Sequence, residues 1–245
     1  MKILEVCADS LDSVKAAIEG GASRVELCSG LAEGGVTPSA AFIRAAVGTG
    51  IKVNVLIRPR GGDFVYSAEE AELILDDIRT AVSLGANGVV TGALCTDGSI
   101  DEELCRRMAE AAGGKELTFH RAFDVCRDPE EALRLIAELG YNRILTSGLA
   151  SSAEKGIPML RKLQEKASGS GVIIMAGCGV NSCNAGDIAR LSGVTELHAS
   201  ARHRLPSAMT FRNSSVSMGT PGSDEYSRYV TDPKEVRAII EAINS

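Results

Sequence analysis

The sequence has no excess of positive charge. Lysine and arginine together number 26, against 32 aspartates and glutamates, which gives a formal net charge of −6 at pH 7. Proteins that bind nucleic acid or anionic membrane surfaces usually present a basic patch. We therefore expect neither nucleic acid nor a membrane among the partners of this chain.

Long hydrophobic runs are also missing. No stretch of the 245 residues approaches the roughly 20 apolar residues of a membrane-spanning helix. The first residues, MKILEV, pass directly into a strand pattern and show neither the apolar core nor the cleavage site of a signal peptide. The sequence thus predicts a cytoplasmic protein.

The seven cysteines form no Cys-x-x-Cys pair. They are scattered, without the tight clusters of structural zinc modules. An odd number of scattered cysteines in a cytoplasmic protein argues against disulfides. Apart from Cys7 and Cys28, we expect packing or surface thiols: Cys95, Cys105, Cys126, Cys178 and Cys183.

Strand and helix patterns alternate along most of the chain. Eight apolar segments show the two-residue period of β-strands, and each is followed by a connection long enough for a crossover. They lie near residues 3–9, 24–28, 53–57, 88–92, 116–121, 143–147, 172–176 and 196–200. This order favours one α/β domain over residues 1–245, a (β/α)8 TIM-type barrel, with a doubly wound parallel sheet as the alternative.

Local motifs predict where helices begin. Ser67 and Glu70 form a potential capping box, and Pro38 is placed to open a helix in its first turn. Residues 202–231 break the alternation and predict an extended loop after the eighth strand. Asp232 then caps a last helix.

Polar residues share one face on five of the predicted strands. In a barrel, alternate strand residues point inward, and active sites form where the strands end. The inward set combines carboxylates, thiols, an arginine and imidazoles: Glu5, Cys7, Glu26, Cys28, Asn54, Arg58, Thr118, His120, Glu196 and His198.

Four of these residues are the candidate catalytic group: Glu5, Glu26, Arg58 and His120. We predict that Arg58 lies between the two glutamates and offsets their desolvation through charge-assisted hydrogen bonds. One interpretation is a structural ion network. The other is acid/base chemistry, with His120 and a glutamate whose pKa is raised by burial.

Cys7 and Cys28 occupy matching places on adjacent predicted strands. Their sulfurs are expected to lie close enough to share a metal ion, and soft thiolates select Cu(I) over harder ions. Buried cysteines also serve as small hydrophobic residues, which is the competing interpretation.

Glycine, serine and arginine follow several strands at the same end of the predicted barrel. Glycines let backbone N–H groups approach an anion, and barrels often hold phosphate after strands seven and eight. The candidate anion-binding residues are Arg60, Ser147, Gly148, Gly177, Gly179, Ser200 and Arg202. Ordinary turn glycines and solvated arginines are the alternative.

The segment Phe211–Gly219 is too apolar for a flexible linker. Long loops in compact domains are often functional. We expect either a lid or a contact between subunits.

Six motifs in this order resemble the copper homeostasis protein CutC family: Glu5–Ser10 (EVCADS), Arg24–Gly35 (RVELCSGLAEGG), Ile57–Phe64 (IRPRGGDF), Thr118–Asp124 (TFHRAFD), Leu145–Gly148 (LTSG) and Leu197–Ala201 (LHASA). The similarity extends over nearly the whole chain. Phe211–Ser215 (FRNSS) is similar to the eukaryotic-type members with their extended tail.

The resemblance implies a single (β/α)8 barrel with a role in copper homeostasis, in the cytoplasm and in animals also in the nucleus. The family's proposed Cu(I) ligands correspond to Cys7 and Cys28, so Cu(I) is the implied cofactor and copper the implied partner. A homo-oligomer is expected, because homo-oligomers occur in the family. The chain departs from the usual Gly-Gly-Gly at Gly177-Cys-Gly179, where the extra thiol either joins the site or replaces a turn glycine.

Two copper-binding thiols do not explain why carboxylates, an arginine and a histidine share the same cavity. The alternative function is an enzyme of unassigned reaction. It would use Glu5, Glu26, Arg58 and His120 in the barrel mouth to act on a small anionic substrate that carries phosphate or carboxylate.

Overall fold

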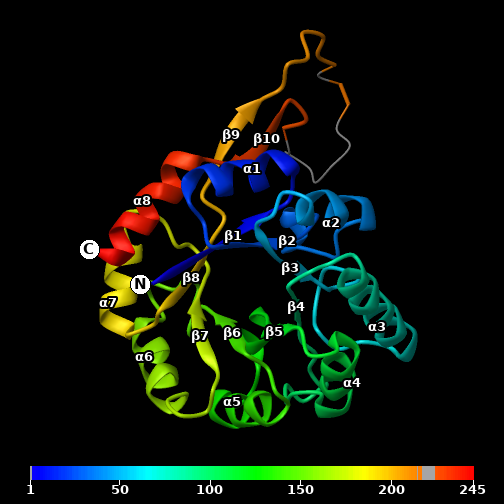
Figure 1. Ribbon diagram of the computed structural model, residues 1–245, viewed down its shortest axis with the longest axis vertical. Helices are drawn as coiled ribbons and strands as arrows, with labels where there is room; N and C mark the ends of the chain where they lie inside the picture. The colour runs from blue at the N-terminus through cyan, green and yellow to red at the C-terminus, as the bar shows by residue number, and fades with distance from the viewer. Residues whose placement is uncertain (1, 214, 217–223) are drawn as a thin grey trace.

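Eight parallel strands close into a barrel in the order β1 to β8. The computed structural model describes residues 2–213, 215–216 and 224–245. Helices surround the barrel, so the fold is a (β/α)8 barrel (Figure 1). The predicted barrel is confirmed, and the doubly wound sheet is excluded.

The barrel closes where β1 pairs with both β2 and β8. Glu5 lies opposite Arg24 on one side and opposite His198 on the other. The strands are β1 (Ile3–Ala8), β2 (Arg24–Leu27), β3 (Lys52–Leu56), β4 (Gly88–Thr91), β5 (Glu116–Phe119), β6 (Arg143–Thr146), β7 (Ile173–Ala176) and β8 (Glu196–Ala199). This register brings polar side chains from both ends of the chain into one interior.

The helices are α1 (Leu11–Gly20), α2 (Ala40–Val47), α3 (Ala68–Ser83), α4 (Glu102–Ala112), α5 (Pro129–Glu138), α6 (Ile157–Lys166), α7 (Ala185–Ser192) and α8 (Pro233–Asn244), with 3-10 turns η1 (Leu31–Glu33) and η2 (Arg121–Val125). The capping box at Ser67 and Glu70 is present. In the described part of the chain, no helix is long and apolar enough to cross a membrane.

The prediction that Pro38 opens the second helix was wrong. The helix begins at Ala40, and the Ser39 side chain caps it by accepting from Phe42 N–H at 3.2 Å. A serine side chain satisfies a free N–H of the first turn, which proline cannot do.

The main hydrophobic core lies between the barrel and its helices. Val6, Val25, Val53 and Leu197, one from each of four strands, are fully buried there. These residues alternate along their strands with the polar residues that point inward. The alternation therefore separates an apolar outer layer from a polar interior.

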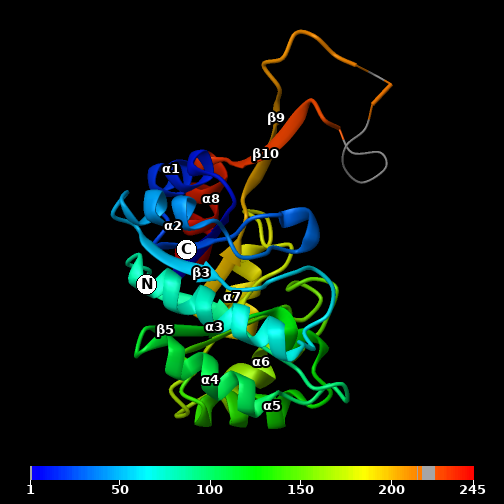
Figure 2. The same cartoon turned by 90° about the vertical axis from the view of Figure 1, so that its right-hand side faces the viewer.

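The region predicted as a loop after the eighth strand contains a two-stranded antiparallel ribbon. β9 (Arg202–Pro206) pairs with β10 (Ser227–Thr231), and the pair projects from the barrel (Figure 2). Arg228 anchors it by an ion pair of 2.6 Å with Asp12 on α1. The strands were missed because this ribbon packs outside the barrel's alternating pattern.

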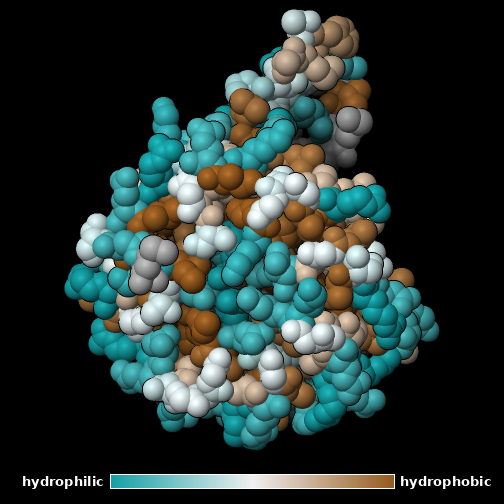
Figure 3. All heavy atoms as spheres, viewed as in Figure 1, coloured by the Kyte–Doolittle hydropathy of each residue, from teal (hydrophilic) through white to brown (hydrophobic). Residues whose placement is uncertain are grey.

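Exposed hydrophobic side chains gather on this extension (Figure 3): Leu205, Met209, Phe211, Val216 and Tyr229. An apolar surface of this kind is typical of an interaction site. The predicted lid or subunit contact over Phe211–Gly219 falls partly outside the described residues, which omit 214 and 217–223.

Gly20 provides a test of how the barrel closes between α1 and α8. A Cβ added at Gly20 would lie 2.5 Å from Val236 Cβ. We expect Gly20→Ala to lower the free energy of unfolding by about 1–3 kcal/mol in urea titrations, although alanine favours helices. Gly48→Ala, whose added Cβ would meet nothing closer than 3.4 Å, is the control, and an equal loss there would contradict the packing argument.

Candidate functional site

A row of buried ion pairs fills the barrel interior. Arg24 on β2 donates from Nε to Glu5 Oε2 at 2.5 Å and from Nη2 to Glu196 on β8. Arg143 on β6 donates from Nε to Glu196 Oε2 at 2.6 Å. All four residues are at most 5% exposed. Such buried charges are tolerated because each is paired and hydrogen-bonded.

Glu5 connects this network to the barrel mouth. Asn54 donates to its Oε2 at 3.1 Å, and His198 Nδ1 lies 2.9 Å from its Oε1. Burial alone would raise the pKa of Glu5, but Arg24 and His198 hold it well below its ordinary value. Glu5 is therefore ionised. Its carboxylate accepts a hydrogen bond from the His198 ring and so orients that ring.

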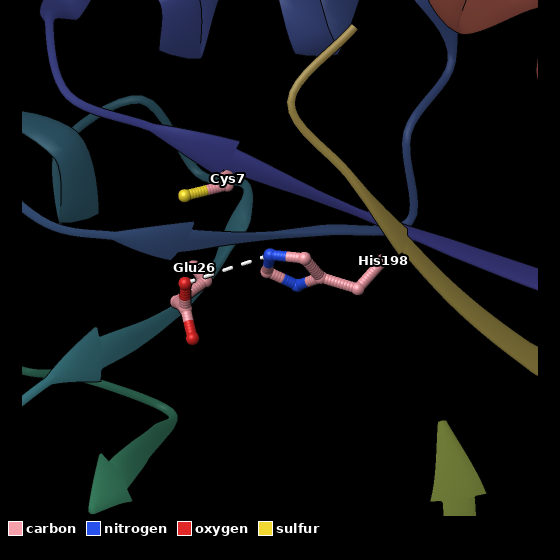
Figure 4. A group of neighbouring side chains, drawn as sticks. All are labelled: Cys7, Glu26 and His198. Carbon is pink, nitrogen blue, oxygen red and sulfur yellow. Dashed lines mark ion pairs between the residues drawn. The ribbon is translucent and has the colours of Figure 1, made fainter. Parts of the chain in front are cut away.

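Cys7, Glu26 and His198 form a compact group above this network. One sulfur, oxygen or nitrogen atom from each lies within 4.8 Å of the others. Figure 4 shows Glu26 and His198 turned toward each other, with Oε2 and Nε2 3.7 Å apart, and the Cys7 sulfur beside them. These three atom types are ones that bind transition metals.

The pKa shifts within this group reflect burial and mutual charge. Burial raises the pKa of Glu26, against the opposing effect of His198. Burial alone would lower the pKa of His198, but the charge of Glu26 and hydrogen bonds with Cys7 and Glu5 raise it well above its ordinary value. His198 is therefore an imidazolium at neutral pH.

Cys7 and Cys28 meet as their strand positions predicted. Their sulfurs are 3.6 Å apart, so the thiols share a hydrogen bond and are not disulfide-bonded, which would require about 2.05 Å. This hydrogen bond and burial raise the pKa of the Cys7 thiol well above its ordinary value. Leu56, Val90 and Leu31 pack around the pair.

A pocket of about 400 Å³ opens above this group at the carboxyl ends of the strands. Its volume falls in the usual range for small-molecule sites. Members of the candidate site that line it are Cys7, Glu26, Arg58, His120 and His198. Cys28 and Glu5 lie beneath this surface and are fully buried.

The predicted role of Arg58 as counter-charge for the glutamates was wrong, because Arg24 pairs with Glu5. The terminal nitrogens of Arg58 donate to three backbone carbonyls, at 2.8, 2.9 and 2.6 Å: those of Glu33, Gly35 and Gly62. Its guanidinium thereby holds the loops after β2 and β3 together, which form one wall of the pocket.

His120 follows β5 and is 4% exposed. Its Nδ1 accepts a hydrogen bond from Ala122 N–H at 3.2 Å. Burial and the nearby charge of Arg58 lower the pKa of His120 to about 3. The ring is therefore neutral at physiological pH and lies apart from the Glu5 network.

The predicted anion-binding residues separate into two groups. Gly179, Ser200 and Arg202 line the pocket. Arg60 instead forms an ion pair of 2.6 Å with Glu70, the capping residue of α3.

The loops after β6 and β7 keep these backbone N–H groups occupied. Ser147 N–H donates to Asp124, Gly148 N–H to Thr146 Oγ1 at 2.9 Å, and Gly177 N–H to Thr146 O at 3.0 Å. In this structure Ser147, Gly148 and Gly177 therefore have no free N–H to offer an anion.

Comparisons with known proteins show the family to which the chain belongs. The model of the CutC family matches residues 2–203. The chain is 51% identical over 246 residues to a family protein CutC of Bacteroides fragilis, covering 99% of this chain and 98% of that protein. The chain belongs to the CutC family.

Another member is the human copper homeostasis protein cutC homolog, which is 48% identical over 239 residues and covers 97% of this chain and 87% of that protein. The CutC crystal structure from Streptococcus agalactiae has a TM-score of 0.78 at 36% identity and covers 82% of this chain and 99% of that one. The Bacteroides alignment covers almost the whole chain, so the segment after β8 is not confined to eukaryotic CutC proteins.

The Gly177-Cys-Gly179 turn reaches the pocket. Cys178 has a φ of 83°, a conformation that favours glycine, and lines the pocket near Gly179. Its thiol donates to Ser151 O at 3.5 Å. The Cys178 thiol therefore stands at a turn position whose backbone favours glycine, and it lines the cavity.

Sequence reasoning missed Arg24 and Arg143 and placed His198 only among inward-facing residues. Arg24 stands two residues before Glu26, and Arg143 two before Leu145, which lines the pocket. Strand parity extended to the first residue of each strand would have found both arginines.

Arg24→Met tests the buried network. Because it leaves Glu5 and Glu196 without this partner, we expect a loss of about 3–5 kcal/mol in the free energy of unfolding at pH 7. The pKa of Glu5 is lowered on folding, so this contribution is present above about pH 4.3 and is lost as pH falls below it. The difference from wild type should therefore shrink in acid.

Arg79→Met is the matched control, since Arg79 and its partner Asp76 are 58% and 74% exposed. This variant should lose at most about 1 kcal/mol in the free energy of unfolding. Equal losses in the two variants, measured by denaturant titration, would contradict the account of the network.

The protonation states of the histidines can be measured directly. Nitrogen chemical shifts at pH 7.5, with signals assigned through His→Gln variants, should show His198 as an imidazolium and His120 as a neutral ring protonated at Nε2. A neutral His198 in the metal-free protein would contradict the proposed charge pairing with Glu5 and Glu26.

Proposed function

We propose that this CutC protein is a cytoplasmic protein that binds Cu(I) through Cys7 and Cys28. The observation that carries the proposal is the pair of sulfurs 3.6 Å apart on adjacent strands. Metal–sulfur bonds are about 2.3 Å long, so one ion can reach both atoms. Soft thiolate ligands favour Cu(I) over harder ions.

The surroundings support binding of copper as a cargo ion. Cys7 lines the open pocket, and Cys28 lies behind it, out of contact with solvent. Glu26 and His198 lie beside Cys7 and supply oxygen and nitrogen atoms from the open side. An ion entering through the mouth would thus meet Cys7 before Cys28.

The Cys7 thiol must lose its proton when the metal binds. Because its pKa is raised, the affinity for Cu(I) should increase with pH. Imidazolium at His198 repels a cation, so deprotonation of that ring favours binding in the same direction.

Competition titrations with a Cu(I) chelator under anaerobic conditions test this proposal. We expect wild type to bind one Cu(I) per chain, and Cys7→Ser or Cys28→Ser to weaken binding about tenfold or more, since each removes a sulfur ligand. Affinity should rise between pH 6 and pH 8.

Cys183→Ser, which changes an exposed cysteine, is the matched control and should bind as wild type does. Cys178→Ser reports whether the pocket thiol also takes part. Unchanged Cu(I) affinity in both Cys7→Ser and Cys28→Ser would refute the proposed site.

A further inference from the structure

Two buried hydrogen-bond donors in the pocket wall have no partner. Within the described parts of the chain, His120 Nε2 and Arg58 Nε form no hydrogen bond. The two residues are 4% and 6% exposed, and both line the pocket. Buried donors without an acceptor are rare and costly, and such groups often serve a ligand.

The proton of His120 is fixed on Nε2. Its Nδ1 accepts from Ala122 N–H at 3.2 Å, so in a neutral ring the hydrogen must be on the other nitrogen. The pKa of His120, lowered to about 3, keeps the ring neutral. The wall therefore presents an N–H donor that does not change with physiological pH.

Packing against Phe64 holds both side chains in place. The Phe64 ring lies 4.9 Å from the His120 ring and 5.1 Å from Arg58 Cζ, measured to the Phe64 centroid. A Cβ at Gly92 would come within 3.0 Å of His120 Nδ1. With Arg58 held by three carbonyls, both donors are preorganised.

The mouth of the pocket adds positive charge. Arg202 lies over the Tyr229 ring, 5.3 Å from its centroid, and donates from Nε to Ser200. In the portion of the chain that the structure describes, Arg202 forms no ion pair. Its charge is therefore available to attract an anion.

We infer that the pocket binds a small organic oxyanion, a carboxylate or a phosphate ester, whose charged oxygen accepts from His120 Nε2 and Arg58 Nε. Two N–H donors and a guanidinium charge match such an oxygen. Glu26 and His198 also line the pocket, so an uncharged, hydroxyl-bearing part of the ligand lies beside them. This site goes beyond copper binding and uses neither cysteine.

Isothermal titration calorimetry on the metal-free full chain tests the inference with three probes: inorganic phosphate, glycerol 3-phosphate and malate. We expect at least one probe to bind with a Kd below about 10 mM. Preference between glycerol 3-phosphate and malate distinguishes a phosphate ester from a carboxylate as the preferred ligand.

His120→Phe keeps an aromatic ring but removes the donor, and should weaken binding about tenfold or more. His120→Gln should retain most of the affinity for the probe, because its amide nitrogen places an N–H at a similar distance from the backbone. Arg202→Gln should weaken binding and reduce its dependence on salt.

The outcome is separate from that of the copper experiment. Cys7→Ser and Cys28→Ser should bind the oxyanion as wild type does, and His120→Phe should bind Cu(I) as wild type does. Absence of binding for all three probes, or equal binding by folded His120→Phe and wild type, would overturn the inference.

Discussion

The ion pair between Arg24 and Glu5 is the interaction on which the barrel interior depends. It keeps Glu5 ionised although the carboxylate is fully buried. The ionised carboxylate accepts from His198 Nδ1, and that hydrogen bond directs Nε2 toward Glu26. A carboxylate that orients a histidine in this way is common at metal-binding sites. The orientation of His198 toward Glu26 therefore follows from one buried charge pair.

The polar interior contains a structural ion network at one depth of the barrel and the groups of the pocket at another, both on the same strands. Glu5 and Glu196 belong to the ion network, and Cys7 and His198, two residues further along, face the pocket. A two-residue step moves along a strand by one inward position. The ion network thus lies directly below the groups that line the pocket. The cavity therefore contains both a structural ion network and a set of chemically reactive groups.

Strand periodicity was sufficient to predict the barrel and most of the inward-facing residues. The pairing of Cys7 with Cys28 followed from it, because both positions are set by backbone register. The role of Arg58 did not, because a long side chain can choose between carboxylates inside the barrel and carbonyls at its rim. That choice depends on the loops after β2 and β3, whose shape local sequence does not determine.

Glycines illustrate the same limit. Gly177 stands where an anion-binding turn was predicted, but a Cβ there would lie 2.5 Å from Leu145 Cδ1. Close packing is therefore a sufficient reason for this glycine. The ribbon of β9 and β10 was missed for a related reason, since its pairing depends on residues about 25 positions apart.

Copper and an organic oxyanion are assigned to different groups of side chains at one pocket, copper to Cys7 and Cys28 and the oxyanion to His120 and Arg58. Copper K-edge X-ray absorption of the protein loaded with one equivalent of Cu(I) measures the ligand atoms directly. Binding by both thiols predicts two sulfur neighbours of copper in wild type and one in Cys28→Ser. A copper shell of nitrogen and oxygen alone would contradict it.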